Sequence, residues 1–189
     1  MSVTAACAAI AAGIGLAACS GLRAFLPLFG AGLAARMLGW PLTPSVAWLG
    51  SNAALIAFGV GALLEIVADK VPLLDHGLDV IHTLIGPVVA VLVSVSAWTQ
   101  LSPAHGLLLS LLAGAPVALG VHSLAAAARV TSSATSLGVA NPVLSAGEDA
   151  ATVTGLVLAF LAPLLLGVVL LVALAVALRW YTRASQKAT

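Results

Sequence analysis

The chain has 189 residues, of which 62% are hydrophobic and only 7% are charged, and its formal net charge is +1. Soluble domains carry about a quarter charged residues, so this composition, with a mean hydropathy of +1.19, excludes a soluble globular protein. The near-neutral charge gives no sign of a nucleic-acid partner, and the partner that the composition indicates is a lipid bilayer.

Apolar runs recur along the whole length, which predicts one all-α transmembrane domain over residues 1–189. At about 20 residues per spanning helix, we expect about six spans. They cover residues 2–19, 22–39, 51–69, 86–99, 106–128 and 150–179. The first segment lacks the basic start of a signal peptide, so we interpret it as a retained span.

The fourth predicted span is short for a membrane. A helix of about a dozen residues rises roughly 18 Å, against about 30 Å of hydrocarbon. Residues 73–85 are therefore predicted to form a partial or re-entrant helix that leads into it. Prolines begin or interrupt helices, and Asn141 is suited to cap the last helix where Pro142 begins it. The predicted helix breaks are Pro72, Gly86, Pro87, Asn141 and Pro142.

A six-span topology sorts the polar residues onto two sides of the membrane. The segments after the first, third and fifth spans contain all six acidic residues against three basic ones, a formal charge of −3 that attracts cations. The other side receives an aromatic belt: Trp40, Trp48, Trp98, Trp180 and Tyr181. This second side holds four basic residues, which favours a cytoplasmic C-terminus, and the N-terminus with it.

Four of the six acidic residues lie between residues 65 and 79. Asp75, Asp79 and His82 share one stripe if residues 73–84 are helical. The predicted cation-binding or substrate-binding residues are Glu65, Asp69, Asp75, His76, Asp79, His82, Glu148 and Asp149. Their predicted charge partners are Arg23, Lys70 and Arg129.

Carboxylates and imidazoles at this spacing suit either a divalent metal ion or a proton relay. Asp75, Asp79 and His82 are the candidate metal ligands, and a divalent metal is the one candidate cofactor. The plain alternative is a solvated acidic loop, but leucine, valine and isoleucine alternate with the charges in an amphipathic pattern. His122, inside the fifth span, is expected to bond to a neighbouring helix.

Three stretches together resemble a known family. They are GLRAFLPL at 21–28, LEIVADKVPLLDHGLDVIHT at 64–83 and NPVLSAGED at 141–149. In combination they resemble the family of small bacterial membrane proteins called domain of unknown function 4126. The resemblance covers nearly the whole chain and implies a helical domain of the bacterial inner membrane, but no particular activity. A weak internal repeat, offset by 55 residues, would align Gly86-Pro87 with Asn141-Pro142, as in some transporters.

These observations leave three functions open. The favoured one is a small transporter or channel for a cation, either a proton or a divalent metal ion, bound by the carboxylate and histidine cluster. The second is a membrane-embedded metal enzyme acting on a lipid-linked substrate, with Glu65 or Glu148 as the general base. The third is a structural or assembly protein, in which small-residue runs such as 11–15 and 125–128 favour close helix packing and homo-oligomers.

Overall fold

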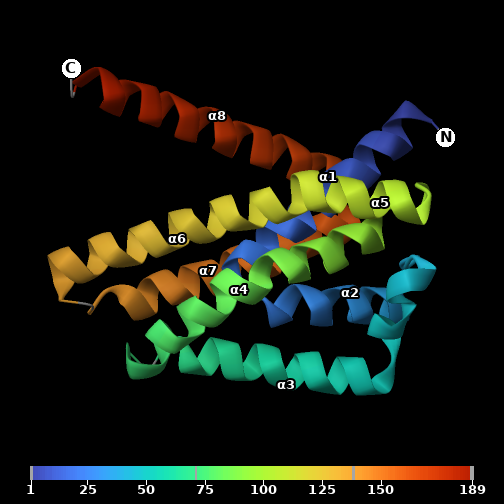
Figure 1. Cartoon of the computed structure of the whole chain (residues 1–189), viewed down its shortest axis with the longest axis horizontal. Helices are drawn as coiled ribbons and strands as arrows, with labels where there is room; N and C mark the ends of the chain where they lie inside the picture. The colour runs from blue at the N-terminus through green and yellow to red at the C-terminus, as the bar shows by residue number, and fades with distance from the viewer. Residues whose placement is uncertain (1, 71, 138, 188–189) are drawn as a thin grey trace.

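The computed structural model describes residues 2–70, 72–137 and 139–187, and for residues 72–81, 180–182 and 184–187 it describes the backbone alone. Within these ranges the secondary structure is helical, with no strand, which confirms the predicted all-α class (Figure 1). The α-helices are α1 (Val3–Leu22), α2 (Phe25–Met37), α3 (Asn52–Ala68), α4 (Pro72–Ala97), α5 (Pro103–Leu109), α6 (Ala115–Ser136), α7 (Asn141–Leu161) and α8 (Pro163–Lys187). A 3₁₀ helix, η1 (Pro44–Gly50), precedes α3, and a π-helical turn, η2 (Ser110–Gly114), joins α5 to α6.

Helix α1 lies at the centre of the bundle and packs against α4, α6, α7 and α8. Its small residues permit this central position, because a Cβ at Gly21 would lie only 2.4 Å from the carbonyl oxygen of Ala118 in α6. Helices α2 and α3 form an antiparallel pair below α4 in Figure 1, connected through η1. Leu16, Val93 and Leu49 are fully buried where these helices meet.

The indole of Trp98 packs into the core at the far end of α4. A Cβ at Gly13 would lie 2.2 Å from its ring nitrogen, and that nitrogen donates a hydrogen bond of 3.0 Å to the carbonyl of Ala9. Because Trp98 is only 2% exposed, the prediction that it belongs to an aromatic belt is wrong. Trp48 is half exposed and Trp40 packs edge-on against Phe160, while the side chains of Trp180 and Tyr181 lie outside the described residues.

Helix α4 is continuous from Pro72 to Ala97, so the prediction of a separate partial helix over residues 73–85 is wrong. Its 26 residues rise about 39 Å at about 1.5 Å per residue, which exceeds the hydrocarbon thickness. Pro72 begins the helix as predicted, but Pro87 lies inside it without ending it. Membrane helices tolerate an internal proline when neighbouring groups satisfy the freed carbonyl. Gly86 is buried in α4, where a Cβ would stand 3.7 Å from the carbonyl oxygen of Ser20 in α1.

The predicted last span over residues 150–179 is divided between two helices. Helix α7 begins at Asn141, as the Asn-Pro pair predicts, but its cap position is Ala140, and the Asn141 amide instead donates to the Ser133 hydroxyl at 3.0 Å. The chain leaves helical geometry at Ala162, and Pro163 starts α8. Since Pro87 lies inside a helix and Pro142 begins one, the two halves of the proposed repeat are not equivalent here.

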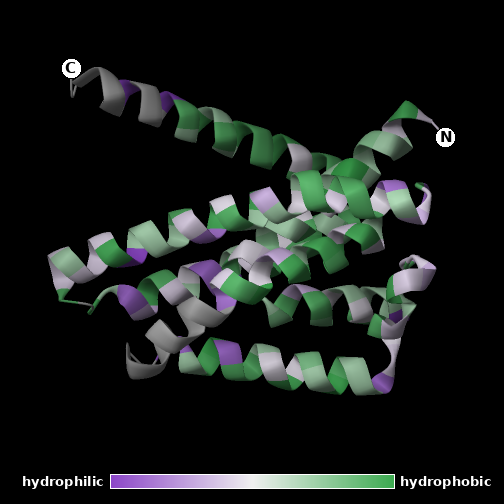
Figure 2. Ribbon diagram, in the orientation of Figure 1, coloured by the Kyte–Doolittle hydropathy of each residue, from purple (hydrophilic) through white to green (hydrophobic). Residues whose placement is uncertain are grey.

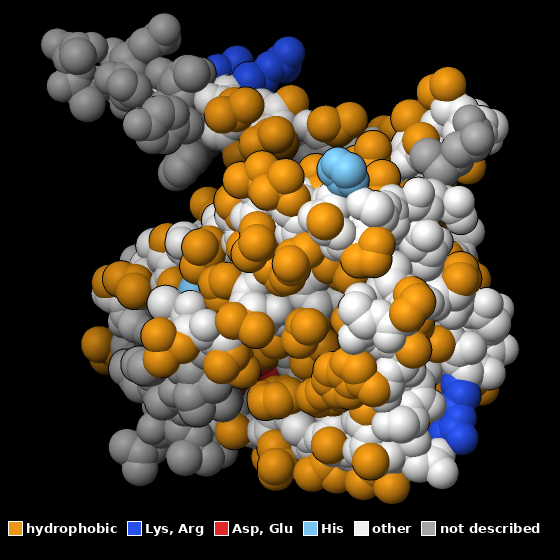
Figure 3. Space-filling view, turned by 45° about the vertical axis from the view of Figure 1, so that its right-hand side comes forward, with side chains coloured by type: hydrophobic (Ala, Val, Ile, Leu, Met, Phe, Trp, Pro, Cys, Tyr) orange, Lys and Arg blue, Asp and Glu red, His pale blue; other side chains and the backbone are white. Residues whose placement is uncertain are grey.

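Three helices are long and apolar enough to cross a membrane: Val3–Leu22, Pro103–Ser136 and Asn141–Leu161. A fourth span results if η1 and α3, which meet at 70°, are counted together. The described residues therefore support a helical membrane protein, while the count of six is not confirmed. Hydrophobic residues dominate the ribbon in Figure 2, and they are spread widely over the face shown in Figure 3, where acidic side chains appear only as a small recessed patch.

Candidate functional site

Charged side chains from four parts of the chain meet at the end of the bundle where α4 begins. Hydrophilic residues gather there on α3, α6 and α7 in Figure 2. We call this group the charge network. Its members are Arg23, Asp69, Lys70, Arg129, Glu148 and Asp149.

Arg23 lies at the centre of the charge network, in the short link between α1 and α2. Its side chain is fully buried, with Nη1 2.6 Å from Asp69 Oδ2. Its Nε donates to Asp149 Oδ1 at 2.7 Å, and its Nη2 donates to the carbonyl and hydroxyl oxygens of Ser145 at 3.1 and 3.0 Å. Burial by itself lowers the pKa of Arg23, but Asp69 and Asp149 together raise that pKa above its ordinary value. Arg23 is therefore a permanent buried positive charge.

Arg129 of α6 is the second arginine of the charge network, and it contacts Asp69 and Glu148. Its Nη1 and Nη2 donate to the two oxygens of Asp69 at 3.1 and 3.0 Å. Its Nε donates to Glu148 Oε1 at 3.2 Å, and Nη2 also contacts Glu148 Oε2. Asp69 therefore accepts from the guanidinium groups of both Arg23 and Arg129, and its contact with Arg129 is bidentate. These contacts hold the end of α3 against α1 and α6.

Lys70 forms the outer edge of the network. Its Nζ lies 2.8 Å from Asp149 Oδ2, and its side chain is 39% exposed. The network thus passes from a buried centre at Arg23 and Asp69 to an exposed rim at Lys70. All three predicted charge partners contact predicted acidic residues.

Glu65 of α3 is buried beside the network and binds the start of α2. Its two carboxylate oxygens accept from the backbone N–H groups of Ala24, at 2.6 Å, and Phe25, at 3.1 Å. The cap position of α2 is Ala24, whose side chain cannot cap. Glu65 therefore supplies, from another helix, the oxygen that a helix N-terminus needs.

His82 of α4 completes this arrangement, since its Nε2 contacts Glu65 Oε1 and its side chain is buried. The ring of His122 in α6 stands edge-on to the His82 ring, with centroids 6.2 Å apart. His122 Nε2 is 3.0 Å from the hydroxyl oxygen of Thr83 in α4, which confirms that His122 bonds to a neighbouring helix. We call these two residues the Glu65–His82 pair.

The side chains of Asp75, His76 and Asp79 lie outside the described residues, so their predicted roles stay predictions. The helical backbone of α4 does put Asp75, Asp79 and His82 on one stripe, as their spacing predicts. Among the side chains that the structure describes, no three from His, Cys, Asp and Glu are arranged to hold a metal ion. A metal at Asp75, Asp79 and His82 is therefore still a prediction.

The described side chains carry only part of the negative charge that the sequence predicts for this face. The charge network has three carboxylates and three basic side chains, and Glu65 brings the sum to −1 when His82 is counted as neutral. Asp75 and Asp79, which bring the predicted sum to −3, have side chains outside the described residues. Two groups in this arrangement were missed from the sequence, the Ser145 side chain and the N–H groups that begin α2. Ser145 stands one helical turn before Glu148 and Asp149, so its position in NPVLSAGED was an available signal.

The family described as "Domain of unknown function (DUF4126)" matches residues 10–183 of the chain. The chain belongs to this family. No curated protein and no solved structure gave a significant match. The DUF4126 match covers the whole charge network and the Glu65–His82 pair, so both lie within the family domain.

Proposed function

We propose that this DUF4126 protein is a small membrane transporter for a cation, coupled to proton binding at Glu65 and His82. One observation carries the proposal: a buried carboxylate contacts a histidine and at the same time caps a neighbouring helix. A change in protonation at that carboxylate therefore acts directly on helix position.

The cost of burying these groups supports a functional role. Each ionisable side chain placed in a membrane costs a few kcal/mol unless it is paired or hydrated. Replacing a buried ion pair by apolar residues is often neutral or stabilising, so such pairs are weak evidence of a stability role. A bundle this apolar has ample hydrophobic surface for packing without them.

Proton binding at Glu65 is linked to α2 through the two N–H groups that it accepts. A protonated carboxyl group is a weaker acceptor than a carboxylate, so protonation weakens the attachment of the first turn of α2. Arg23 immediately precedes that turn and binds Asp69 and Asp149. Loosening the turn therefore disturbs the charge network, which links proton binding to a rearrangement of α2, α3 and α7.

A proton fits the described geometry better than a divalent metal ion as the coupling cation. The four described carboxylates are engaged by arginine, lysine or histidine side chains, which leaves little oxygen for a metal. The groups that face His82 from the neighbouring helices are Glu65 of α3 and His122 of α6.

Proton flux into liposomes that contain the purified protein tests the proposal. A His82→Gln variant keeps a hydrogen-bonding side chain but cannot take up a proton, and we expect its flux to fall to that of empty liposomes. His105→Gln is the matched control, because His105 is exposed and bonds only locally, to Ser102. Equal flux through the two variants would contradict the proposal.

A second candidate is a structural or assembly protein, and the complete pairing of the described network favours it. Under that alternative, replacing an acidic residue lowers stability and causes no transport defect separate from that loss. Measuring the melting temperature and the flux of each variant separates the two functions. A well-folded His82→Gln protein without flux supports the transporter.

A further inference from the structure

Helix α8 returns the chain to the end of the bundle where the charge network lies. Helix α7 begins at that end and runs away from it, helical geometry breaks at Ala162, and α8 begins at Pro163 and runs back. Figure 1 accordingly shows the end of α8 on the same side as the turn between α6 and α7, and the start of α1 on the other side. The sequence prediction joined residues 150–179 into one span, so it placed the basic residues that end α8 on the wrong side of the network.

Basic residues are distributed unevenly between the two ends of the bundle. The chain has seven of them, all within the described backbone. Three belong to the charge network, three lie in the last turns of α8, and only Arg36, in the last turn of α2, lies at the other end. Lysine and arginine are enriched on the cytoplasmic side of membrane proteins. This distribution favours a cytoplasmic location for the end that carries the charge network.

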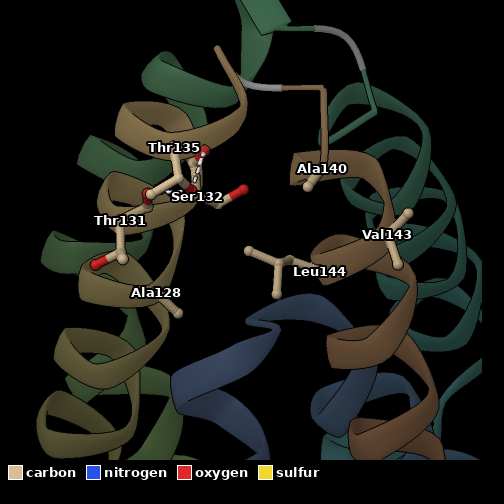
Figure 4. Close-up of a pocket in the computed structure, with 7 residues that line it drawn as sticks. All are labelled: Ala128, Thr131, Ser132, Thr135, Ala140, Val143 and Leu144. Atoms are coloured by element: carbon tan, nitrogen blue, oxygen red, sulfur yellow. Dashed lines mark hydrogen bonds between the residues drawn. The ribbon is translucent and has the colours of Figure 1, made fainter.

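The end of α6 is also polar, as expected for a helix that ends at a membrane surface. Thr131, Ser132 and Thr135 line a hollow of about 470 Å³ beside the turn that leads to α7 (Figure 4). The neighbouring Ser133 hydroxyl accepts a hydrogen bond of 3.0 Å from the side chain of Asn141. Polar groups of this kind are hydrated at a membrane surface, whereas hydrocarbon offers them no partner. The network end of the bundle therefore lies near the level of the lipid headgroups.

The second half of α8 is apolar on all sides until it reaches Arg179. Five of its side chains are each more than half exposed: Leu171, Val172, Leu174, Val176 and Leu178. A helix that is apolar all round belongs in hydrocarbon or in a protein core. The apolar stretch Pro163–Arg179 rises about 24 Å at about 1.5 Å per residue, against about 30 Å of hydrocarbon. Arg179 therefore comes within reach of the headgroups, because a long arginine side chain extends its charge toward the surface.

Three basic residues form one stripe at the end of α8. Arg179, Arg183 and Lys187 follow each other at intervals of four residues, which puts them on one face of the helix. Arg179 and Arg183 are exposed, and residues 163–189 contain no acidic residue. Figure 3 shows basic side chains near the end of α8, well apart from the recessed acidic patch. The stripe is therefore a positively charged surface at headgroup level.

We propose that the end of α8 binds the phosphate groups of anionic phospholipids in the cytoplasmic leaflet, with Arg179 and Arg183 as the contact residues. The charge network then lies at the same membrane surface. Guanidinium groups bind phosphate oxygens through paired hydrogen bonds, and the cytoplasmic leaflet attracts basic segments through its anionic lipids. A lipid fits better than a soluble anion, because the apolar turns before Arg179 also contact its acyl chains.

Lipid binding would fix the end of α8 that lies farthest from its packing on α1. A Cβ at Gly15 of α1 would lie 2.2 Å from the Leu166 side chain, and one at Gly167 would lie 3.0 Å from the Ala11 side chain. These contacts involve the first turns of α8. Headgroups bound at Arg179 and Arg183 would hold its last turns.

Native mass spectrometry of the purified protein in neutral detergent tests the lipid site. Phosphatidylglycerol and phosphatidylcholine with identical acyl chains are the two probes. We expect the unaltered protein to prefer phosphatidylglycerol by about tenfold or more, because each basic side chain near a membrane surface contributes about fivefold. The Arg179→Gln/Arg183→Gln variant should bind both lipids equally. An unaltered protein without this preference would overturn the proposal.

Arg36→Gln is the matched control, because Arg36 is exposed and lies at the opposite end of the bundle. It should keep the preference for phosphatidylglycerol, and an equal loss in this control and in the double variant would contradict a site on α8. Excess inorganic phosphate should leave the bound phosphatidylglycerol in place. Displacement of the lipid by phosphate alone would show that the stripe binds a soluble anion instead.

A membrane-impermeant maleimide applied to intact cells tests the cytoplasmic location. Single cysteines are introduced as Gln100→Cys, between α4 and α5, and as Val139→Cys, between α6 and α7, in a protein that also carries Cys7→Ser. We expect labelling of Gln100→Cys in intact cells, and of Val139→Cys only after the membranes are opened. Labelling of Val139→Cys in intact cells would overturn the cytoplasmic location. Neither experiment depends on proton flux, so both test α8 independently of the proposed transport.

Discussion

Asp69 is fully buried and binds the guanidinium groups of both Arg23 and Arg129. Each arginine in turn reaches a carboxylate of α7, so removing this single side chain leaves two buried positive charges with fewer partners. Breaking a buried ion pair is far more costly than breaking an exposed one, because the remaining charge stays desolvated. The contribution of Asp69 should therefore differ sharply from that of its neighbour Lys70.

We expect Asp69→Asn to destabilise the folded protein by about 3–5 kcal/mol. Lys70→Gln, which removes the exposed pair with Asp149, should cost about 1 kcal/mol or less. Thermal unfolding of both variants in the same detergent compares them directly. Similar melting temperatures for the two variants would argue against a buried network centred on Asp69.

For single residues, the sequence was sufficient to identify the charged side chains but not how they pair. The spacing of the acids and the proximity of Arg23, Lys70 and Arg129 on one side followed from span order. The sharing of Asp69 by two arginines, and the approach of His82 to His122, depend on how α1, α4 and α6 are rotated against each other. That rotation is set by side-chain packing between helices, which the order of apolar residues along one chain does not specify.

At the scale of single elements, α2 depends on α3 for its first turn. Its cap position is alanine, and the acceptor for its leading N–H groups is the Glu65 carboxylate. A helix that lacks a local cap begins where a neighbouring helix supplies one. The start of α2 is therefore a tertiary contact, which explains why sequence signals for helix starts do not mark it.

We expect Glu65→Ala to destabilise the start of α2 by about 0.5–2 kcal/mol, the usual cost of losing an N-cap. Glu65→Gln keeps one of the two acceptor oxygens and should retain part of the cap. Hydrogen–deuterium exchange of a peptide that contains Ala24 and Phe25 measures the effect. We expect the fastest exchange in the alanine variant and an intermediate rate in the glutamine variant, and exchange as slow as in the unaltered protein in both variants would show that Glu65 does not cap α2.

Close contacts between helices give a second prediction for elements. A Cβ at Gly21 would lie 2.4 Å from a backbone oxygen of Ala118, whereas one at Gly120 meets nothing within 4 Å. Gly21→Ala should therefore destabilise the protein by about 1–3 kcal/mol through overpacking. Gly120→Ala should stabilise it by about 0.5–1 kcal/mol, since alanine favours the helix interior. Shifts of melting temperature in the same direction would contradict the packing of α1 on α6.

For the whole molecule, composition was sufficient to predict an all-α chain with helices long and apolar enough to cross a membrane, but the number and ends of the spans were harder to predict. Pro87 and Pro163 follow apolar residues in the same way, yet one lies inside α4 and the other begins α8. The difference depends on whether neighbouring helices hold the chain straight, and a proline gives the same local signal in both cases. The hollow lined by residues of α6 and α7 likewise depends on how these two helices pack, which no sequence motif specifies.

The Trp98 indole closes the end of the bundle that is remote from the charges, against Gly13 and the carbonyl of Ala9. A side chain at position 13 would collide with this ring, so the contact requires glycine there. One small residue in α1 therefore determines how closely α1 and the end of α4 can approach each other, and any larger residue at that position would force the two helices apart.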